Sequence, residues 1–240
     1  GRVADEIPKP LLQVGGYPLI YYAVEESLKA GCKEVIVIVK NDTDPVKRFL
    51  LSMEFARFLK FVNQPEPLGI VDAVVLSAPL VIDSSFLLIY LDQLLINPIS
   101  ASEQLVMWQG KLESSLLAAL VRVPVAHQKD FTSAPFVYSE RDLVPDPIPL
   151  TPERTVLNFP PDTDMKTARE LFLFGRVIFP ATSIRFFSNM RDEVTDNIMP
   201  VYHMIAKKFP HYAVRLSGTP YDAGTEDGYH YTVRLLQKAL

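Results

Sequence analysis

The stretch EVIVIV at residues 34–39 decides the fold class that we expect for this chain. After its first residue it is an uninterrupted run of β-branched side chains, which is typical of a strand buried on both faces, as in a parallel sheet. Just before it, residues 18–30 place apolar side chains at helical spacing, and Gly31 follows as a suitable helix-ending residue. A helix leading into a buried strand indicates an α/β fold.

The same alternation of helices and strands continues along the chain. The elements expected after residue 40 are helices at 44–55, 69–78, 102–112, 182–190, 196–209 and 225–240, and strands at 59–63, 85–91, 116–123, 171–179 and 212–216. Strands and helices at this spacing imply βαβ units. We therefore predict a doubly wound, mostly parallel, Rossmann-like sheet, with an irregular proline-rich segment between Pro124 and Pro161.

Composition and charge narrow the classes of function. Hydrophobic residues make up 48% of the chain and charged residues 22%, as in a protein with a buried core. The net charge of −4 offers no basic surface for nucleic acid. The single cysteine, Cys32, excludes an internal disulfide and a multi-cysteine metal site. No apolar run is long enough to span a membrane, and residues 1–10 hold no signal-peptide core. We expect a cytoplasmic protein without membrane or nucleic-acid partners.

Two aspartates stand where ligands bind in doubly wound folds. Asp92 follows the apolar strand at 85–91, and Asp222 lies in the loop after the strand at 212–216. Ligands of such sheets bind beyond the carboxyl ends of the strands. If the strands are neighbours, the two carboxylates could share one Mg²⁺, which takes one or two carboxylates plus substrate phosphates. Taken singly, such an aspartate is more often a turn residue, and Asp222 could cap the helix near residue 225.

Three further segments carry candidate residues. Prolines on both sides of Lys9 fix the backbone there, so its ammonium can be presented to a phosphate as a fixed charge. Gln64 can donate to and accept from a nucleotide base, and Gly69 would let the backbone approach a flat ring at a helix start. Gly175 lies inside an expected strand, where glycine marks close approach of a ligand or another backbone. A solvated lysine and an ordinary strand-to-helix loop remain alternatives for the first two.

Together, these segments resemble in their order the motifs of sugar-phosphate nucleotidyltransferases. The likeness is greatest to bacterial UTP–glucose-1-phosphate uridylyltransferases, and it extends from residue 6 to the carboxyl terminus. The similar stretches are IPKPLLQVGGYPLI (residues 7–20), QPEPLG (64–69), LLIYLD (87–92), FGR (174–176), DEVTD (192–196) and YDAGT (221–225).

The resemblance implies a reaction and the residues that serve it. A phosphate oxygen of a sugar 1-phosphate, expected to be glucose 1-phosphate, would attack the α-phosphorus of a nucleoside triphosphate, expected to be UTP, and pyrophosphate would leave. Asp92 and Asp222 would bind Mg²⁺, and Lys9 would stabilise the developing negative charge. Residues 1–240 would form one domain, with residues 1–125 as its nucleotide-binding half and residues 126–240 as its sugar-binding half.

The resemblance also assigns the binding residues. Gln64, Leu68 and Gly69 would bind the nucleotide base, while Asn158 and Gly175 would bind the sugar.

Some departures from the family pattern keep two functions open. The chain starts at Gly1, where a Gly-x-Gly-Thr-Arg loop should be ending, so we expect either that further residues precede it or that the fold has changed. Phe159 replaces the lysine of a sugar-binding motif, and Asp72 adds a negative charge near the expected phosphates. The alternatives are an active enzyme and a degenerate member that serves as a nucleotide-binding regulatory or structural subunit. Residues 106–108 could form an interface between copies, so a homo-oligomer also remains open.

Overall fold

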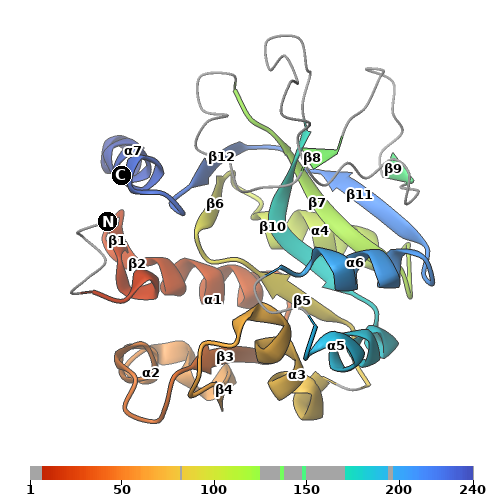
Figure 1. Ribbon diagram of the computed structural model, residues 1–240. Helices are drawn as coiled ribbons and strands as arrows, with labels where there is room; N and C mark the ends of the chain where they lie inside the picture. Colours follow the sequence, from red (N-terminus) through yellow and green to blue (C-terminus); the bar gives the residue numbers. More distant parts are fainter. Residues whose placement is uncertain are drawn as a thin grey trace.

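A computed structural model describes residues 7–81, 83–124, 136–137, 148–149, 171–193 and 197–239 (Figure 1). Helices and strands alternate along much of the described chain. In order they are η1 (Lys9–Leu11), β1 (Gln13–Val14), β2 (Tyr17–Pro18), α1 (Leu19–Lys29), β3 (Val35–Val39), α2 (Pro45–Leu51), η2 (Glu54–Phe58), β4 (Leu59–Asn63), α3 (Gly69–Val81), β5 (Phe86–Ile89), β6 (Gln93–Ile96), α4 (Ala101–Gln109), β7 (Leu116–Arg122), β8 (Phe136–Val137), β9 (Ile148–Pro149), β10 (Leu171–Phe179), η5 (Ala181–Ser183), α5 (Ile184–Met190), α6 (Met199–Ala206), β11 (His211–Arg215), β12 (Thr219–Asp222) and α7 (Glu226–Ala239).

The largest sheet has the strand order β5-β10-β7-β11-β9, and β8 pairs with β10 as well. The predicted α/β class is confirmed, but the sheets are mixed rather than mostly parallel. Among the described strands, β11 runs parallel to β7 and β3 parallel to β4, whereas β10 is antiparallel to both β5 and β7. The sequence could not predict this, because an apolar run indicates burial on both faces but not the direction of the neighbouring strand.

Strand β7 separates two hydrophobic layers. Its side chains alternate: Leu117 and Ala119 belong to a cluster that includes α4, while Leu116 and Ala118 pack with residues of α3, α5 and α6. Helices therefore cover both faces of this strand, as predicted for a doubly wound sheet (Figure 1). No helix within the described ranges is both long enough and apolar enough to cross a membrane.

A second, smaller sheet is formed by β3 and β4. Its residues Val37 and Val39 are buried and pack with residues of α1 and α2. Gly31 follows the C-cap residue Ala30 of α1 and adopts φ +90°, which confirms it as a helix-ending residue. The helix expected at 44–55 is shorter than predicted: it ends at Leu51, and the separate 3₁₀ helix η2 follows.

The strand pair β6–β12 was missed by the sequence analysis. We expected Asp222 to lie in a loop, but it is the last residue of β12, which pairs antiparallel with β6. Each of these strands has only four residues, too few for an alternation of polar and apolar side chains to be recognised. The pair joins segments of the chain that are far apart in sequence.

A buried histidine in the large sheet gives the fold a sensitivity to acid. His211, at the start of β11, is 5% exposed, and its Nε2 is hydrogen-bonded to the hydroxyl of Tyr202 in α6. Its Nδ1 has no hydrogen-bond partner within the described part of the chain. Burial lowers the pKa of His211 from 6.5 to about 4, and the charge of His203 acts in the same direction.

We predict that the free energy of unfolding falls as the pH is lowered from 6.5 towards about 4. The folded pKa of His211 lies below the unfolded one, so in this window only the unfolded chain takes up the proton, at a cost to stability of up to about 3 kcal/mol. Urea unfolding of the wild type and of His211→Gln, at pH 7 and pH 4.5, isolates this contribution. The stability difference between the two proteins should shift in favour of the variant at the lower pH. An unchanged difference would contradict the prediction.

Candidate active site

The pairing of β6 with β12 brings the two strand-end aspartates together. Asp222 stands opposite Gln93 in the ladder, and the N–H of Ala223 donates to the carbonyl of Asp92 at 2.7 Å. Both carboxylates approach the backbone of Gly224: a methyl group there would lie 2.7 Å from Asp222 Oδ1 and 3.2 Å from Asp92 Oδ2. The two aspartates are therefore neighbours, although the strands expected to bring them together are not: β10 and β7 lie between β5 and β11 in the large sheet.

Lys9 lies directly beside this pair. Its Nζ is 2.6 Å from Asp92 Oδ2, across a sequence separation of 83 residues. Pro8 precedes the short helix η1 and Pro10 lies within it, so the lysine is held by restricted backbone as expected. The lysine side chain is 43% exposed, which leaves its ammonium within reach of a substrate. In the structure this ammonium is thus both partly exposed to solvent and paired with Asp92.

Asp222 is a buried carboxylate with a raised pKa. Gln93 Nε2 donates to its Oδ2 at 3.0 Å, and the N–H of Gly224 donates to its Oδ1 at 2.7 Å. Burial nevertheless raises the pKa of Asp222 above its ordinary value, and the charge of Asp92 adds to the rise. The alternative role as a helix cap is not what the structure contains, because Thr225 Oγ1 accepts from the N–H of Gly228 at 3.1 Å in the first turn of α7.

These two aspartates suit one divalent cation. Groups of three or more histidine, cysteine or acidic side chains placed to hold a metal do not occur in the described ranges. Magnesium requires fewer protein ligands, because substrate phosphates and water complete its shell. The two carboxylates are neighbours, and the pKa of the buried one, Asp222, is raised. A bound cation would offset both the burial of this charge and its repulsion by the other carboxylate. Asp92 and Asp222 therefore fit the ion that the sequence analysis expected.

A cavity of about 300 Å³ opens beside the aspartates. Its wall includes Tyr90, Asp92 and Asp222, together with several residues of β10. Gly175 is one of these, and a methyl group there would lie 2.7 Å from Tyr90 Cβ and 3.1 Å from Gln93 Oε1. The expected close approach at Gly175 is thus made by side chains of the protein, on the wall of a cavity large enough for a small ligand.

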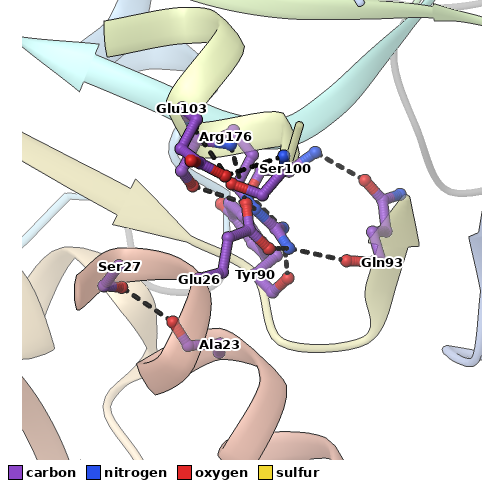
Figure 2. A network of polar contacts seen from close by, with 10 residues as sticks. Ala23, Glu26, Ser27, Tyr90, Gln93, Ser100, Glu103 and Arg176 are labelled. Atoms are coloured by element: carbon purple, nitrogen blue, oxygen red, sulfur yellow. Dashed lines mark hydrogen bonds and ion pairs between the residues drawn. The ribbon is translucent and has the colours of Figure 1, made fainter. Parts of the chain in front are cut away.

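A buried ion pair holds the loop that carries Asp92. Arg176 is fully buried, and its Nε and Nη2 donate to the two carboxylate oxygens of Glu26 at 2.8 and 2.7 Å. The same guanidinium donates to the carbonyls of Tyr90 and Gln93, each at 2.9 Å. Figure 2 shows these contacts, which connect Glu26 of α1 to the loop from Tyr90 to Gln93 through Arg176. Arg176 therefore fixes the backbone on both sides of Asp92.

Glu26 remains ionised in this setting. Burial opposes its charge, but the Arg176 guanidinium and hydrogen bonds from the side chain and backbone of Ser102 hold the pKa of Glu26 below its ordinary value. Neither Glu26 nor Gln93 was predicted from the sequence to be functional. The signal that could have helped was Arg176 itself, since an arginine within the apolar strand at 171–179 requires a buried anionic partner.

The loop that follows β4 holds its candidate residues in a local network. Gln64 Nε2 donates to the carbonyl of Gly69 at 3.0 Å and to Asp72 Oδ2 at 2.8 Å. Gly69 adopts φ +86°, which explains why glycine stands there, and the side chain of Leu68 is exposed. Asp72 is also paired with Arg191, whose Nε donates to it at 2.7 Å. The extra negative charge expected near the phosphates is therefore neutralised within the protein.

Not every predicted site residue can be placed. Asn158, expected to contact the sugar, lies outside the described residues. The remaining candidates form two groups, one around Asp92 and one around Gln64.

The chain is similar to one family of known proteins. The model of the nucleotidyl transferase family matches residues 3–137, which is more than half of the chain. No curated protein sequence is similar enough to be counted as a relative.

Several solved structures are similar to this chain in fold. A UDP-glucose pyrophosphorylase from Acinetobacter baumannii is 18% identical with a TM-score of 0.77, over 97% of this chain and 86% of that one. A UDP-glucose pyrophosphorylase complexed with UDP-glucose is 20% identical with a TM-score of 0.74, over 100% and 94%. A putative glucose-1-phosphate thymidylyltransferase from Bacillus anthracis, in complex with a sucrose, is 17% identical with a TM-score of 0.75, over 98% and 89%.

We predict that Arg176→Met destabilises the protein by about 3–5 kcal/mol, because it leaves Glu26 as a buried carboxylate without its partner. The matched control is Lys60→Met, which removes the exposed pair that Lys60 forms with Glu34 at 3.5 Å. That pair should contribute less than about 1 kcal/mol. Guanidinium unfolding of both variants at pH 7 measures the difference. Equal losses in the two variants would show that the buried pair does not support the fold as argued.

Proposed function

Because the chain belongs to the nucleotidyl transferase family, we propose that it transfers a uridylyl group from UTP to glucose 1-phosphate with the help of Mg²⁺. The family predicted from the ordered motifs is confirmed by the match. The observation that carries the proposal is the grouping of Lys9, Asp92 and Asp222 beside a cavity. The choice of UTP and glucose is supported by the likeness to pyrophosphorylases of UDP-glucose, one of them complexed with UDP-glucose.

The proposed chemistry is an in-line displacement. A phosphate oxygen of glucose 1-phosphate attacks the α-phosphorus of UTP, the bond from that phosphorus to the β-phosphate oxygen breaks, and pyrophosphate leaves with the bonding electrons. Mg²⁺, when bound, adds positive charge against the phosphate oxygens. Positioning and electrostatic stabilisation supply most of the rate in such transfers, so little covalent chemistry is required of the side chains.

The protein's own residues would divide this work. Asp92 and Asp222 would hold the metal, which would supply positive charge beside the reacting phosphates. Lys9, whose ammonium is partly exposed, stabilises charge that develops on the phosphate oxygens.

Substrate binding would involve both groups of candidate residues. Gln64, Leu68 and Gly69 would contact the base, since glycine allows close approach of backbone to a ring. Gly175 and the cavity wall, together with Asn158, would enclose the sugar.

The direct test is release of pyrophosphate from UTP and glucose 1-phosphate in the presence of Mg²⁺. Turnover is expected for the wild type and should disappear with chelator. Metal-dependent binding of UTP without turnover on any pair of nucleotide and sugar phosphate would instead support a regulatory or structural subunit, the alternative kept from the sequence.

Asp92→Asn should lower kcat by about a hundredfold or more, because one metal ligand and its charge are lost. The fold should survive, since the ion pair that Asp92 makes with Lys9 is partly exposed. Glu113→Gln, which removes an exposed carboxylate elsewhere, is the control and should keep wild-type activity. Full activity in Asp92→Asn would remove this residue from the site.

Lys9→Met should lower kcat by about 10²–10³, the usual cost of removing one electrostatic donor to a reacting group. Steady-state kinetics should show a much smaller change in the KM for glucose 1-phosphate, because the lysine is assigned to the charge that develops during reaction. A raised KM with an unchanged kcat would make Lys9 a binding residue only.

A further inference from the structure

We propose that Gln93 is a positioning residue that fixes the carboxylate of Asp222 for metal binding, and that the buried Arg176–Glu26 pair anchors it. This inference rests on the metal site proposed above and adds residues that do not themselves touch the metal. It concerns the glutamine that directly follows Asp92 in the chain.

Every strong hydrogen-bonding group in the side chain of Gln93 is engaged. Its Nε2 donates to Asp222 Oδ2 at 3.0 Å, and its Oε1 accepts from the N–H of Gly175 at 2.5 Å. The residue is 8% exposed. Rotating the amide by half a turn would set its oxygen against the carboxylate and its NH₂ against a backbone N–H. The two partners therefore allow only one orientation of this side chain.

The orientation of the Gln93 amide determines which positions of the Asp222 carboxylate remain free for a cation. The carboxylate receives one hydrogen bond on each oxygen, from Gln93 and from the N–H of Gly224. A carboxylate has about four lone-pair positions, so roughly half remain for a metal. The two donors prevent the group from turning about its last bond. Because Asp92 lies close by, the Asp92 carboxylate oxygens and the free positions of Asp222 can bind the same ion.

Gln93 is itself held by Arg176, which donates to its backbone carbonyl. Arg176 and Gly175 are consecutive in β10, so their side-chain directions lie on opposite faces of the strand. On the face of Gly175 lies the cavity, and on the other lies Glu26 of α1. The guanidinium of Arg176 reaches the carbonyl of Gln93, and Figure 2 shows it between Glu26 and the Tyr90–Gln93 loop. Its charge is balanced by Glu26, so it adds little net charge near the metal.

The same contacts explain why glutamine suits this position. Asp222 needs a donor and the N–H of Gly175 needs an acceptor, and a single amide provides both. Methionine has nearly the same length but neither group. Asparagine keeps both groups on a side chain one methylene shorter, which cannot span the two partners together.

The test is binding of Mn²⁺ to the purified chain, followed by the electron paramagnetic resonance signal of the free ion. Gln93→Met should weaken Mn²⁺ binding by about 10–100-fold, the usual effect of losing a hydrogen bond to a metal ligand. Gln93→Asn, which keeps a polar group in the buried position and so protects folding, should show a smaller loss in the same direction.

The matched control is Gln104→Met. Gln104 also uses both ends of its amide, since its Nε2 donates to the carbonyls of Ile99 and Ser217 and its Oε1 accepts from the N–H of Ser217. It lies outside the aspartate group, so its variant should bind Mn²⁺ as the wild type does. In kinetics, the metal concentration for half-maximal rate should rise in the Gln93 variants more than kcat at saturating metal falls.

The outcomes separate the two proposals. Folded Gln93 variants that bind Mn²⁺ as tightly as the wild type would overturn the role of Gln93 and leave the metal site standing. A wild-type chain that binds no Mn²⁺, while Asp92→Asn changes nothing, would overturn the metal site and this inference together. An equal fall in kcat for Gln93→Met and Gln104→Met, with no change in metal requirement, would show a merely structural role.

Discussion

The contact on which the site depends is the buried ion pair of Arg176 and Glu26. A pair of this kind adds little to stability compared with apolar residues of the same size, because both charges must lose their water. What the pair contributes here is the orientation of the backbone around Asp92. The guanidinium has more donors than Glu26 can use, and the others hold the carbonyls of Tyr90 and Gln93. A loop between two strands is thereby given the rigidity that a charged site requires.

The sequence predicted most of the elements and the aspartate group, and the reasons for its failures are physical. The long apolar runs and their order placed α1, β3, β4, β7 and β10 close to their observed bounds. Lys9, Asp92 and Asp222 were predicted as site residues because several motifs occur in one order. The antiparallel direction of β10 was not predicted, since burial does not encode direction. The strands β6 and β12 are too short to leave a periodic signal.

The sequence could not predict which charged residues pair with one another. Glu26 and Arg176 are 150 positions apart, and Asp72 and Arg191 are 119 apart. Each could have paired with many other charges, and only the packing of helices against the sheet selects one partner. Asp72 illustrates the point: taken alone it looked like an unfavourable charge near phosphates, yet it is buried and balanced by an arginine beyond the end of α5.

The short pairing of β6 with β12 also bears on when the site can form during folding. Gln93 and Asp222 are separated by 129 positions, so closing this contact costs a large loop entropy and comes late relative to local contacts. Helices α1 and α4 can form from neighbouring residues alone, but the aspartates meet only after the chain has folded back over that whole distance. A nascent or partly folded molecule would therefore contain its locally formed helices and still lack the two neighbouring carboxylates.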